Sequence, residues 1–237
     1  MSAALLQTRA LCAGYSEMPM LRDIEMRVEP GEIVALVGSN GAGKTTLLRA
    51  LSRLLRSTGR IEFDGREIGA LTPEEVFRRG LVQVPEGRQL FDNMTVHENL
   101  LMGAYRRTDR LGIVQSLERV YVLFPQLAKR RGNRAGNMSG GEQQMCALAR
   151  GLMAAPKLLM IDEMSLGLAP VVVDQLREVL LEIRNQGVTV LLVEQDVFFA
   201  FEVADRGYVL EGGSVVREGT AKALANDPQV QRAYFGL

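Results

Sequence analysis

Apolar and polar positions along the chain follow two periods. Residues 5–11 and 22–28 alternate between apolar and polar side chains, which predicts strands of a sheet with one exposed face. Residues 32–38, 158–162 and 189–194 are almost wholly apolar, and such runs are typical of parallel strands buried on both faces. Because helical patterns separate these runs, the sequence predicts a layered α/β core.

Two further segments belong to this predicted core. A helix is expected from about Lys44 to Leu55, directly after the apolar run at 32–38. Near the end of the chain, YVLEGG and SVVREG predict two short strands joined at Gly212 and Gly213. No internal repeat is evident, so a repeat architecture is not expected.

The middle of the chain has a different pattern. From Thr95 to Met153, helical patterns dominate and strand signals are rare. The basic, glycine-containing loop KRRGNRAGN at 129–137 interrupts them. We interpret 87–150 as a helical subdomain inserted into a single domain, 1–237, whose α/β core comprises 1–86 and 151–237.

Composition and charge exclude several classes of protein. The chain has 28 Lys and Arg against 28 Asp and Glu, and phosphate-dominated nucleic-acid binders show a basic excess, so no nucleic-acid partner is expected. Cys12 and Cys146 are too isolated for a disulfide framework, which favours a reducing cytoplasm. No secretory pattern is expected at the N-terminus, and the apolar runs fall far short of the roughly 18 residues of a membrane span. Work at a membrane would therefore require docking on another chain.

The segment GSNGAGKTT at 38–46 matches the pattern G-x-x-x-x-G-K-[ST] of a phosphate-binding loop. Its glycines let backbone N–H groups point inward, and the following helix adds partial positive charge. Lys44 can reach the β- and γ-phosphates of a nucleotide, and the Thr45 hydroxyl can ligate Mg²⁺. A buried strand before the loop and a helix after it argue against a chance glycine-rich turn. The expected binding residues are Gly38, Ser39, Asn40, Gly41, Ala42, Gly43, Lys44, Thr45 and Thr46.

Two acids follow a buried strand, at Asp162 and Glu163. Ligands bind at the carboxyl ends of strands in open α/β sheets. Adjacent strand residues point to opposite sides, so the two acids can serve different tasks. Asp162 suits the Mg²⁺ shell beside Thr45, and Glu163 suits a general base for an attacking water. A surface pair of acids is the alternative, and the phosphate loop upstream favours the catalytic interpretation.

A second candidate anion site lies at Ser139, Gly140 and Gly141, followed by Glu142. A hydroxyl, flexible backbone N–H groups and a helix N-terminus together suit a phosphate. An ordinary helix cap is the alternative. One nucleotide does not need two such sites from the same chain, so the second site is explained if it covers the nucleotide of a neighbouring subunit.

These three motifs, in this order and spacing, resemble those of an ABC ATPase, the nucleotide-binding subunit of an ABC transporter. The resemblance covers essentially the whole chain. It implies a P-loop NTPase (RecA-like) α/β core with an antiparallel β subdomain and an inserted α-helical subdomain. It also implies a second ATPase subunit, identical or related, in a head-to-tail dimer that binds ATP and Mg²⁺. Each ATP would lie between the Lys44 loop of one subunit and Ser139–Gly141 of the other.

Other positions carry roles only through this resemblance. Tyr15 falls where the family places an aromatic ring that stacks on adenine, with a sheet-packing tyrosine as the alternative. SLGLAP at 165–170 occupies the loop that contacts the opposite subunit. Glu86 stands where most members have a glutamine that senses the metal, since Gln83 comes three residues too early. Gln195 replaces the usual histidine and can donate an amide hydrogen bond to the γ-phosphate.

A third departure is Met164, which stands where proline is usual and predicts a looser turn after Glu163. The segments VPEGR, MSGGEQQM, SLGLAP, VEQ and ADRGYVLE together resemble the ATP-binding subunits of branched-chain amino acid importers. This implies partner transmembrane permease subunits, a solute-binding protein that acts indirectly, and a peripheral location on the cytoplasmic face of the inner (cell) membrane. Urea or amide importers, a non-transport ABC ATPase and a nucleotide sensor without turnover are the alternatives.

Overall fold

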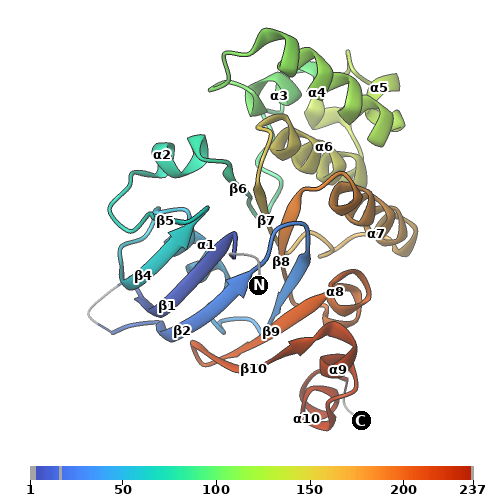
Figure 1. Ribbon diagram of the computed structural model, residues 1–237. Coiled ribbons are helices and arrows are strands. Elements are labelled where there is room, and N and C mark those ends of the chain that lie inside the picture. The colour runs from blue at the N-terminus through green and yellow to red at the C-terminus, as the bar shows by residue number, and fades with distance from the viewer. Residues whose placement is uncertain (1–3, 16–17, 236–237) are drawn as a thin grey trace.

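The strands of the computed structural model, which describes residues 4–15 and 18–235, form two sheets (Figure 1). The first is antiparallel, with the strand order β2-β1-β4-β5. Its strands are β1 (Leu6–Ala13), β2 (Leu21–Val28), β4 (Ser57–Phe63) and β5 (Arg66–Glu67). Alternating burial along β2 agrees with the predicted half-exposed sheet.

The second sheet has the order β10-β9-β3-β8-β7-β6. Neighbours from β9 to β6 pair in parallel, and β10 runs antiparallel to β9. Its strands are β3 (Ile33–Val37), β6 (Leu81–Val84), β7 (Leu158–Asp162), β8 (Thr189–Glu194), β9 (Arg206–Glu211) and β10 (Ser214–Thr220). The runs at 158–162 and 189–194 were predicted with these same bounds.

Helix α1 (Lys44–Leu51) packs between the two sheets. It is shorter than the predicted helix at 44–55, because Arg53 takes a left-handed conformation, with φ 59°, that ends it. On β3, Val34 and Leu36 face the α1 side, whereas Ile33 belongs to the opposite core. This period of two lets one wholly apolar strand serve two cores.

Helices cover the other face of the parallel sheet. α6 (Gly140–Met153) and α7 (Pro170–Asn185) pack on β6, β7 and β8. α8 (Val197–Val203) and α9 (Ala221–Ala225) pack on β3 and β9, followed by α10 (Pro228–Val230) and a π-helix at 231–235. Both faces of the central strands are therefore buried, as a parallel sheet requires.

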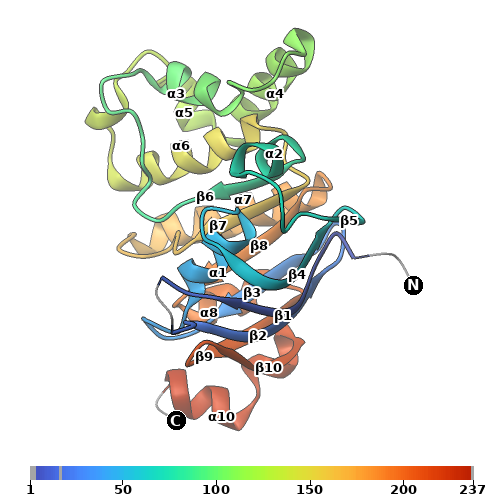
Figure 2. The ribbon, with the colours of Figure 1, turned by 90° about the vertical axis from the view of Figure 1, so that its left-hand side faces the viewer.

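Between β6 and β7 the chain is helical, and its helices other than α6 stand away from the sheets, at the end of the molecule opposite α10 (Figures 1 and 2). The helices are α3 (Val96–Gly103), α4 (Arg110–Leu123), α5 (Pro125–Lys129) and α6. Residue 150, the expected end of the helical segment, lies within α6, which continues to Met153. α2 (Pro73–Arg78), β4, β5 and β6 were not predicted from the hydrophobic pattern.

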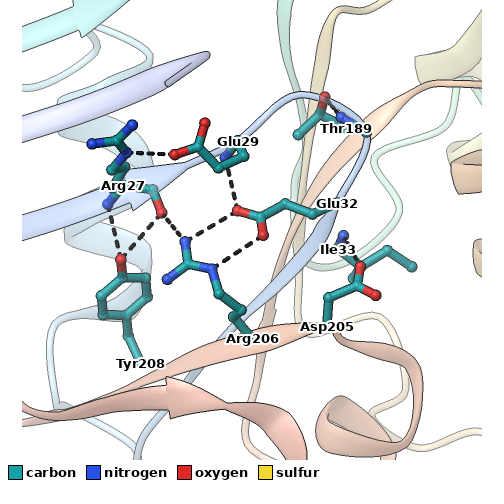
Figure 3. A network of polar contacts seen from close by, with 9 residues as sticks. Arg27, Glu29, Glu32, Ile33, Thr189, Asp205, Arg206 and Tyr208 are labelled. Carbon is teal, nitrogen blue, oxygen red and sulfur yellow. Dashed lines mark hydrogen bonds and ion pairs between the residues drawn. The ribbon is translucent and has the colours of Figure 1, made fainter. Parts of the chain in front are cut away.

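A polar network joins the two sheets where β2 leads into β3 (Figure 3). Arg206 makes a two-pronged ion pair with Glu32, at 3.1 Å for each contact, and donates to the Arg27 carbonyl at 2.7 Å. The Tyr208 hydroxyl donates to the same carbonyl at 3.1 Å and accepts from the Arg27 N–H at 3.0 Å. The network positions β3, which carries the phosphate loop at its other end.

Candidate active site

The phosphate loop follows β3 directly and leads into α1, as predicted. Gly41 and Gly43 have φ values of 80° and 110°, in the left-handed region that favours glycine. A Cβ on Gly38 would lie 2.4 Å from the Leu210 carbonyl oxygen, so only glycine fits there. The loop can therefore curl with its backbone N–H groups around an anion.

Lys44 is buried at the start of α1, and its ammonium group has three acceptors. They are the Gly38 carbonyl at 2.8 Å, the Ser39 carbonyl at 3.2 Å and the Glu163 carboxylate at 3.0 Å. The Lys44 and Glu163 side chains are only 4% and 10% exposed. The structure thus brings together the predicted phosphate-binding lysine and the predicted general base.

Glu163 reaches Lys44 through an unusual backbone conformation. β7 ends at Asp162, and Glu163 has φ 43°, which departs from strand alternation. Glu163 lies beyond the strand, so the expectation that the two acids point to opposite sides by strand alternation does not apply to it. Asp162 hydrogen-bonds with Thr45 at the head of α1, and Glu163 lines a cavity that Thr45 also lines.

Asp162 is 2% exposed, and its Oδ1 atom is buried without a hydrogen-bond partner among the described residues. Burial raises the pKa of its carboxyl to about 6, the Thr45 hydrogen bond opposes the shift, and the negative charges of Glu163 and Glu86 add to it. An unpaired buried oxygen next to a hydroxyl suits a divalent cation. Mg²⁺ is usually held by one or two such ligands together with nucleotide phosphates, so the residues fit this ion.

A cavity of about 330 Å³ lies in front of these groups. Of the expected loop residues, Gly38, Ser39 and Ala42 do not line it, and Ala42 is buried. Thr46 lines the cavity and donates its hydroxyl to the Met20 sulfur at 3.1 Å. The lining residues are Met20, Asn40, Gly41, Gly43, Lys44, Thr45, Thr46, Glu86, Glu163 and Leu166.

Glu86 and Gln195, which stand in place of the usual glutamine and histidine, differ in their position relative to the cavity at Lys44. Glu86 lines the cavity, whereas Gln83 lies on β6 and accepts a hydrogen bond from Ser52 at 2.8 Å. Gln195 follows β8, is exposed, and is not among the residues that line the cavity. Tyr15 is 58% exposed rather than packed in the sheet, and the Arg49 guanidinium lies 5.8 Å from the centre of its ring.

The second anion site lies at the exposed N-terminus of α6. The Ser139 hydroxyl accepts the Glu142 N–H at 3.3 Å, and the Glu142 carboxylate accepts from Ser139, forming a capping box. Arg130 pairs with the same carboxylate at 2.6 Å. Ser139, Gly141 and Glu142 line a cavity of about 400 Å³ that shares no lining residue with the cavity at Lys44.

Two arginines and one buried acid were missed by sequence reasoning. Arg88 donates to Gln143 at 2.8 Å, and Arg150 donates to the backbone carbonyls of Arg88 and Gln89, so the loop after Glu86 is bound to α6. Glu194 accepts hydrogen bonds from Ser165 and is 1% exposed. No sequence motif marks these contacts, because each joins segments far apart in the chain.

Comparison with known proteins explains this combination of sites. The model of the ABC transporter family matches residues 21–165, which hold the phosphate loop, the Ser139 segment and both acids. The chain belongs to the ABC transporter family. This ABC ATPase is 46% identical to the high-affinity branched-chain amino acid transport ATP-binding protein BraG of Pseudomonas aeruginosa, over 94% of the chain and 95% of BraG.

Two further likenesses support the assignment. The chain is 32% identical to the lipopolysaccharide export system ATP-binding protein LptB of Haemophilus influenzae, over 98% of each chain. A solved structure, the ADP conformation of MJ1267, an ATP-binding cassette of an ABC transporter, matches with a TM-score of 0.86 at 26% identity and covers 100% of both chains. The P-loop NTPase fold and the ATP-hydrolysing activity that the sequence predicts are therefore confirmed.

Proposed function

We propose that the chain is the ATP-binding and ATP-hydrolysing subunit that powers uptake of branched-chain amino acids through partner membrane subunits. The observation that carries this proposal is the likeness to BraG, a branched-chain amino acid transport ATP-binding protein, at 46% identity over nearly the full length of both chains. The likeness to the export protein LptB is lower, at 32% identity. The alternative is a urea or amide importer, and the experiment below distinguishes it from the proposed amino acid importer.

In this proposal the cavity at Lys44 binds the triphosphate. Lys44 exchanges its contact with Glu163 for phosphate oxygens, and the backbone of residues 38–46 binds the remaining oxygens. Mg²⁺ would be held by Thr45 and Asp162, with Glu86 nearby, and would neutralise phosphate charge. Tyr15, which is 58% exposed, offers its ring to adenine.

Glu163 orients and deprotonates the attacking water once Lys44 has moved to the phosphates. Its position 3.0 Å from the Lys44 ammonium supports this role, because that ammonium marks where the phosphates bind. Gln195 donates its amide to the γ-phosphate, which requires it to move toward the cavity from its exposed position after β8.

The second half of the site comes from another ATPase subunit. Ser139 and the N-terminus of α6 open on a cavity separate from that of Lys44, which supports their action on the nucleotide of a partner. On binding that nucleotide, the Ser139 hydroxyl would leave its capping box with Glu142. The partner is a second copy of this chain or a related one.

The permease subunits dock on an apolar groove of about 360 Å³ between α2, β6, α3 and α6. Phe91 and Tyr105, which are 45% and 71% exposed, lie at this groove, and a short amphipathic helix fits such a surface. No helix among the described residues is long and apolar enough to cross a membrane. Docking would hold the chain at the cytoplasmic face of the cell membrane, with the solute-binding protein acting through the permeases.

The test is uptake by cells that lack this chain and carry either the wild type or Lys44→Ala. The proposal expects the wild type to restore uptake of radiolabelled leucine, isoleucine and valine, and the variant to restore none. Uptake of urea is measured in the same cells. Restoration of urea uptake without leucine uptake would overturn the proposed substrate class.

A further inference from the structure

Glu194 is a buried acid for which the mechanism above has no use. It is the last residue of β8 and is 1% exposed. Its carboxylate accepts the Ser165 N–H at 3.0 Å and the Ser165 hydroxyl at 2.8 Å, and it also accepts the Met164 N–H. Acids are rarely buried this deeply without compensation, and these three donors supply it.

All three donors lie immediately after Glu163. The Glu163 N–H donates to the Val193 carbonyl at 2.8 Å, so the end of β8 binds every residue from 163 to 165. Met164 itself is fully buried. Whether the turn is looser than one with proline stays a prediction. Met164 has an N–H that Glu194 binds, and proline has none.

The turn needs this support. Glu163 has φ 43°, and a residue other than glycine holds that strained conformation only when its surroundings impose it. The same conformation aims the Glu163 carboxylate at Lys44, 3.0 Å away. Ser165 also begins the 165–170 loop. Leu166 of this loop is 57% exposed and lines the cavity at Lys44.

We propose that Glu194 is a positioning residue for hydrolysis, whose buried carboxylate holds the turn 163–165 so that Glu163 faces the phosphates and the 165–170 loop faces the cavity. This inference rests on the proposed role of Glu163. Glu194 is buried and does not line the cavity at Lys44, so its loss should lower the rate of the chemical step without lowering ATP affinity.

The protonation of Glu194 guides the choice of variant. Burial raises the pKa of its carboxyl to about 7, the hydrogen bonds from Ser165 and Met164 oppose the rise, and the nearby Glu163 charge adds to it. Because the neutral form is already accessible, Glu194→Gln preserves shape and keeps one carbonyl acceptor. Glu194→Ala removes every acceptor and leaves the Ser165 and Met164 donors unpaired.

The experiment measures kcat, KM for ATP and Tm of the full chain with Mg²⁺. Misplacement of a catalytic group by about 1 Å can cost about 100-fold in rate, so kcat should fall about 100-fold in Glu194→Ala and about 10-fold in Glu194→Gln. KM should stay within about twofold. Glu194→Gln should therefore be about tenfold faster than Glu194→Ala at an unchanged KM.

Thr189→Val is the matched control. Thr189 is buried at the other end of β8 and accepts the Gly31 N–H at 2.9 Å, so its loss also removes a hydrogen bond between this strand and a loop. It should lower Tm and leave kcat unchanged. A kcat that stays at the wild-type value in both Glu194 variants would overturn the inference. So would an equal fall of kcat in Thr189→Val at an equal loss of Tm, because the fall would then reflect lost stability alone.

Glu163→Gln separates this inference from the proposed mechanism. Loss of turnover in Glu163→Gln with wild-type turnover in both Glu194 variants defeats the positioning role alone. Wild-type turnover in Glu163→Gln defeats the assignment of the general base, and with it the premise of the inference. Ser165→Ala tests whether Glu194 acts through Ser165. If it does, the effects of Ser165→Ala and Glu194→Ala on kcat should not add.

Discussion

The contact between Lys44 and Glu163 predicts that Glu163→Gln tightens nucleotide binding. In the structure the three donors of the Lys44 ammonium are matched by Gly38, Ser39 and Glu163, so a nucleotide must displace the carboxylate before Lys44 can bind its phosphates. Glutamine competes less well, because its amide carries no charge.

The size of the effect follows from the burial of the pair. A hydrogen bond to a charged group contributes about 1.5–3 kcal/mol, and both side chains are at least nine-tenths buried, so solvent screens the pair little. Glutamine keeps a carbonyl oxygen within reach of Lys44, so the substitution removes only about 1 kcal/mol of the stabilisation that this contact gives the nucleotide-free state. This corresponds to about fivefold tighter binding.

Calorimetric titration of the purified chain with Mg²⁺ and ADP measures this change without turnover. Glu86→Gln is the matched control, because Glu86 lines the same cavity and makes no ion pair with Lys44 among the described residues. Weaker or unchanged ADP binding in Glu163→Gln would refute the reasoning. An equal gain in Glu86→Gln would attribute the effect to net charge rather than to release of Lys44.

Three further predictions concern stability. Tyr208→Phe removes the hydroxyl that bonds both polar backbone atoms of Arg27 and should lower the unfolding free energy by about 1–3 kcal/mol in urea. Gly103→Ala places a Cβ 1.9 Å from the Arg150 carbonyl oxygen and should cost about 1–3 kcal/mol by forcing α3 from α6, measured in the same way. Glu194 has a raised folded-state pKa of about 7, so the folded state binds more protons than the unfolded state between the ordinary carboxyl pKa and that value. Its contribution to stability is therefore fully present at acidic pH and is lost as the pH rises through about 7, by up to about 3 kcal/mol. Unfolding measured from pH 5 to 8 should show this decline in the wild type, and a flatter profile in Glu194→Gln.

Elements with strong periodicity were predicted closely, and elements held by distant contacts were not. The strands at 158–162 and 189–194 have the expected bounds because they are buried on both faces, so each position is apolar. The short strand at 66–67 is exposed at both positions, and its pairing with β4 leaves no apolar alternation to detect. The helix at 44–51 is shorter than expected because one left-handed residue, Arg53, ends it.

The candidate site shows the same division. The phosphate loop and the strand-end acids lie within short, recognisable segments. The structure places Lys44, Thr45 and Glu163 at one cavity, and Asp162 hydrogen-bonds with Thr45. The support of that cavity by Glu194 depends on the adjacency of β7 and β8, whose residues are about 30 positions apart in the chain. Local pattern carries no information on which buried acid meets which loop.

The central claim, that each site combines the Lys44 loop of one chain with Ser139 of another, is tested most directly by mixing two inactive variants. Lys44→Ala and Ser139→Arg should each lack ATP turnover alone, whereas Ser139→Arg should still bind nucleotide as a monomer. In a mixed dimer one site receives both defects and the other is intact, so an equal mixture should recover about a quarter of wild-type turnover. Full turnover by Ser139→Arg alone, or a mixture as inactive as its components, would contradict the shared site.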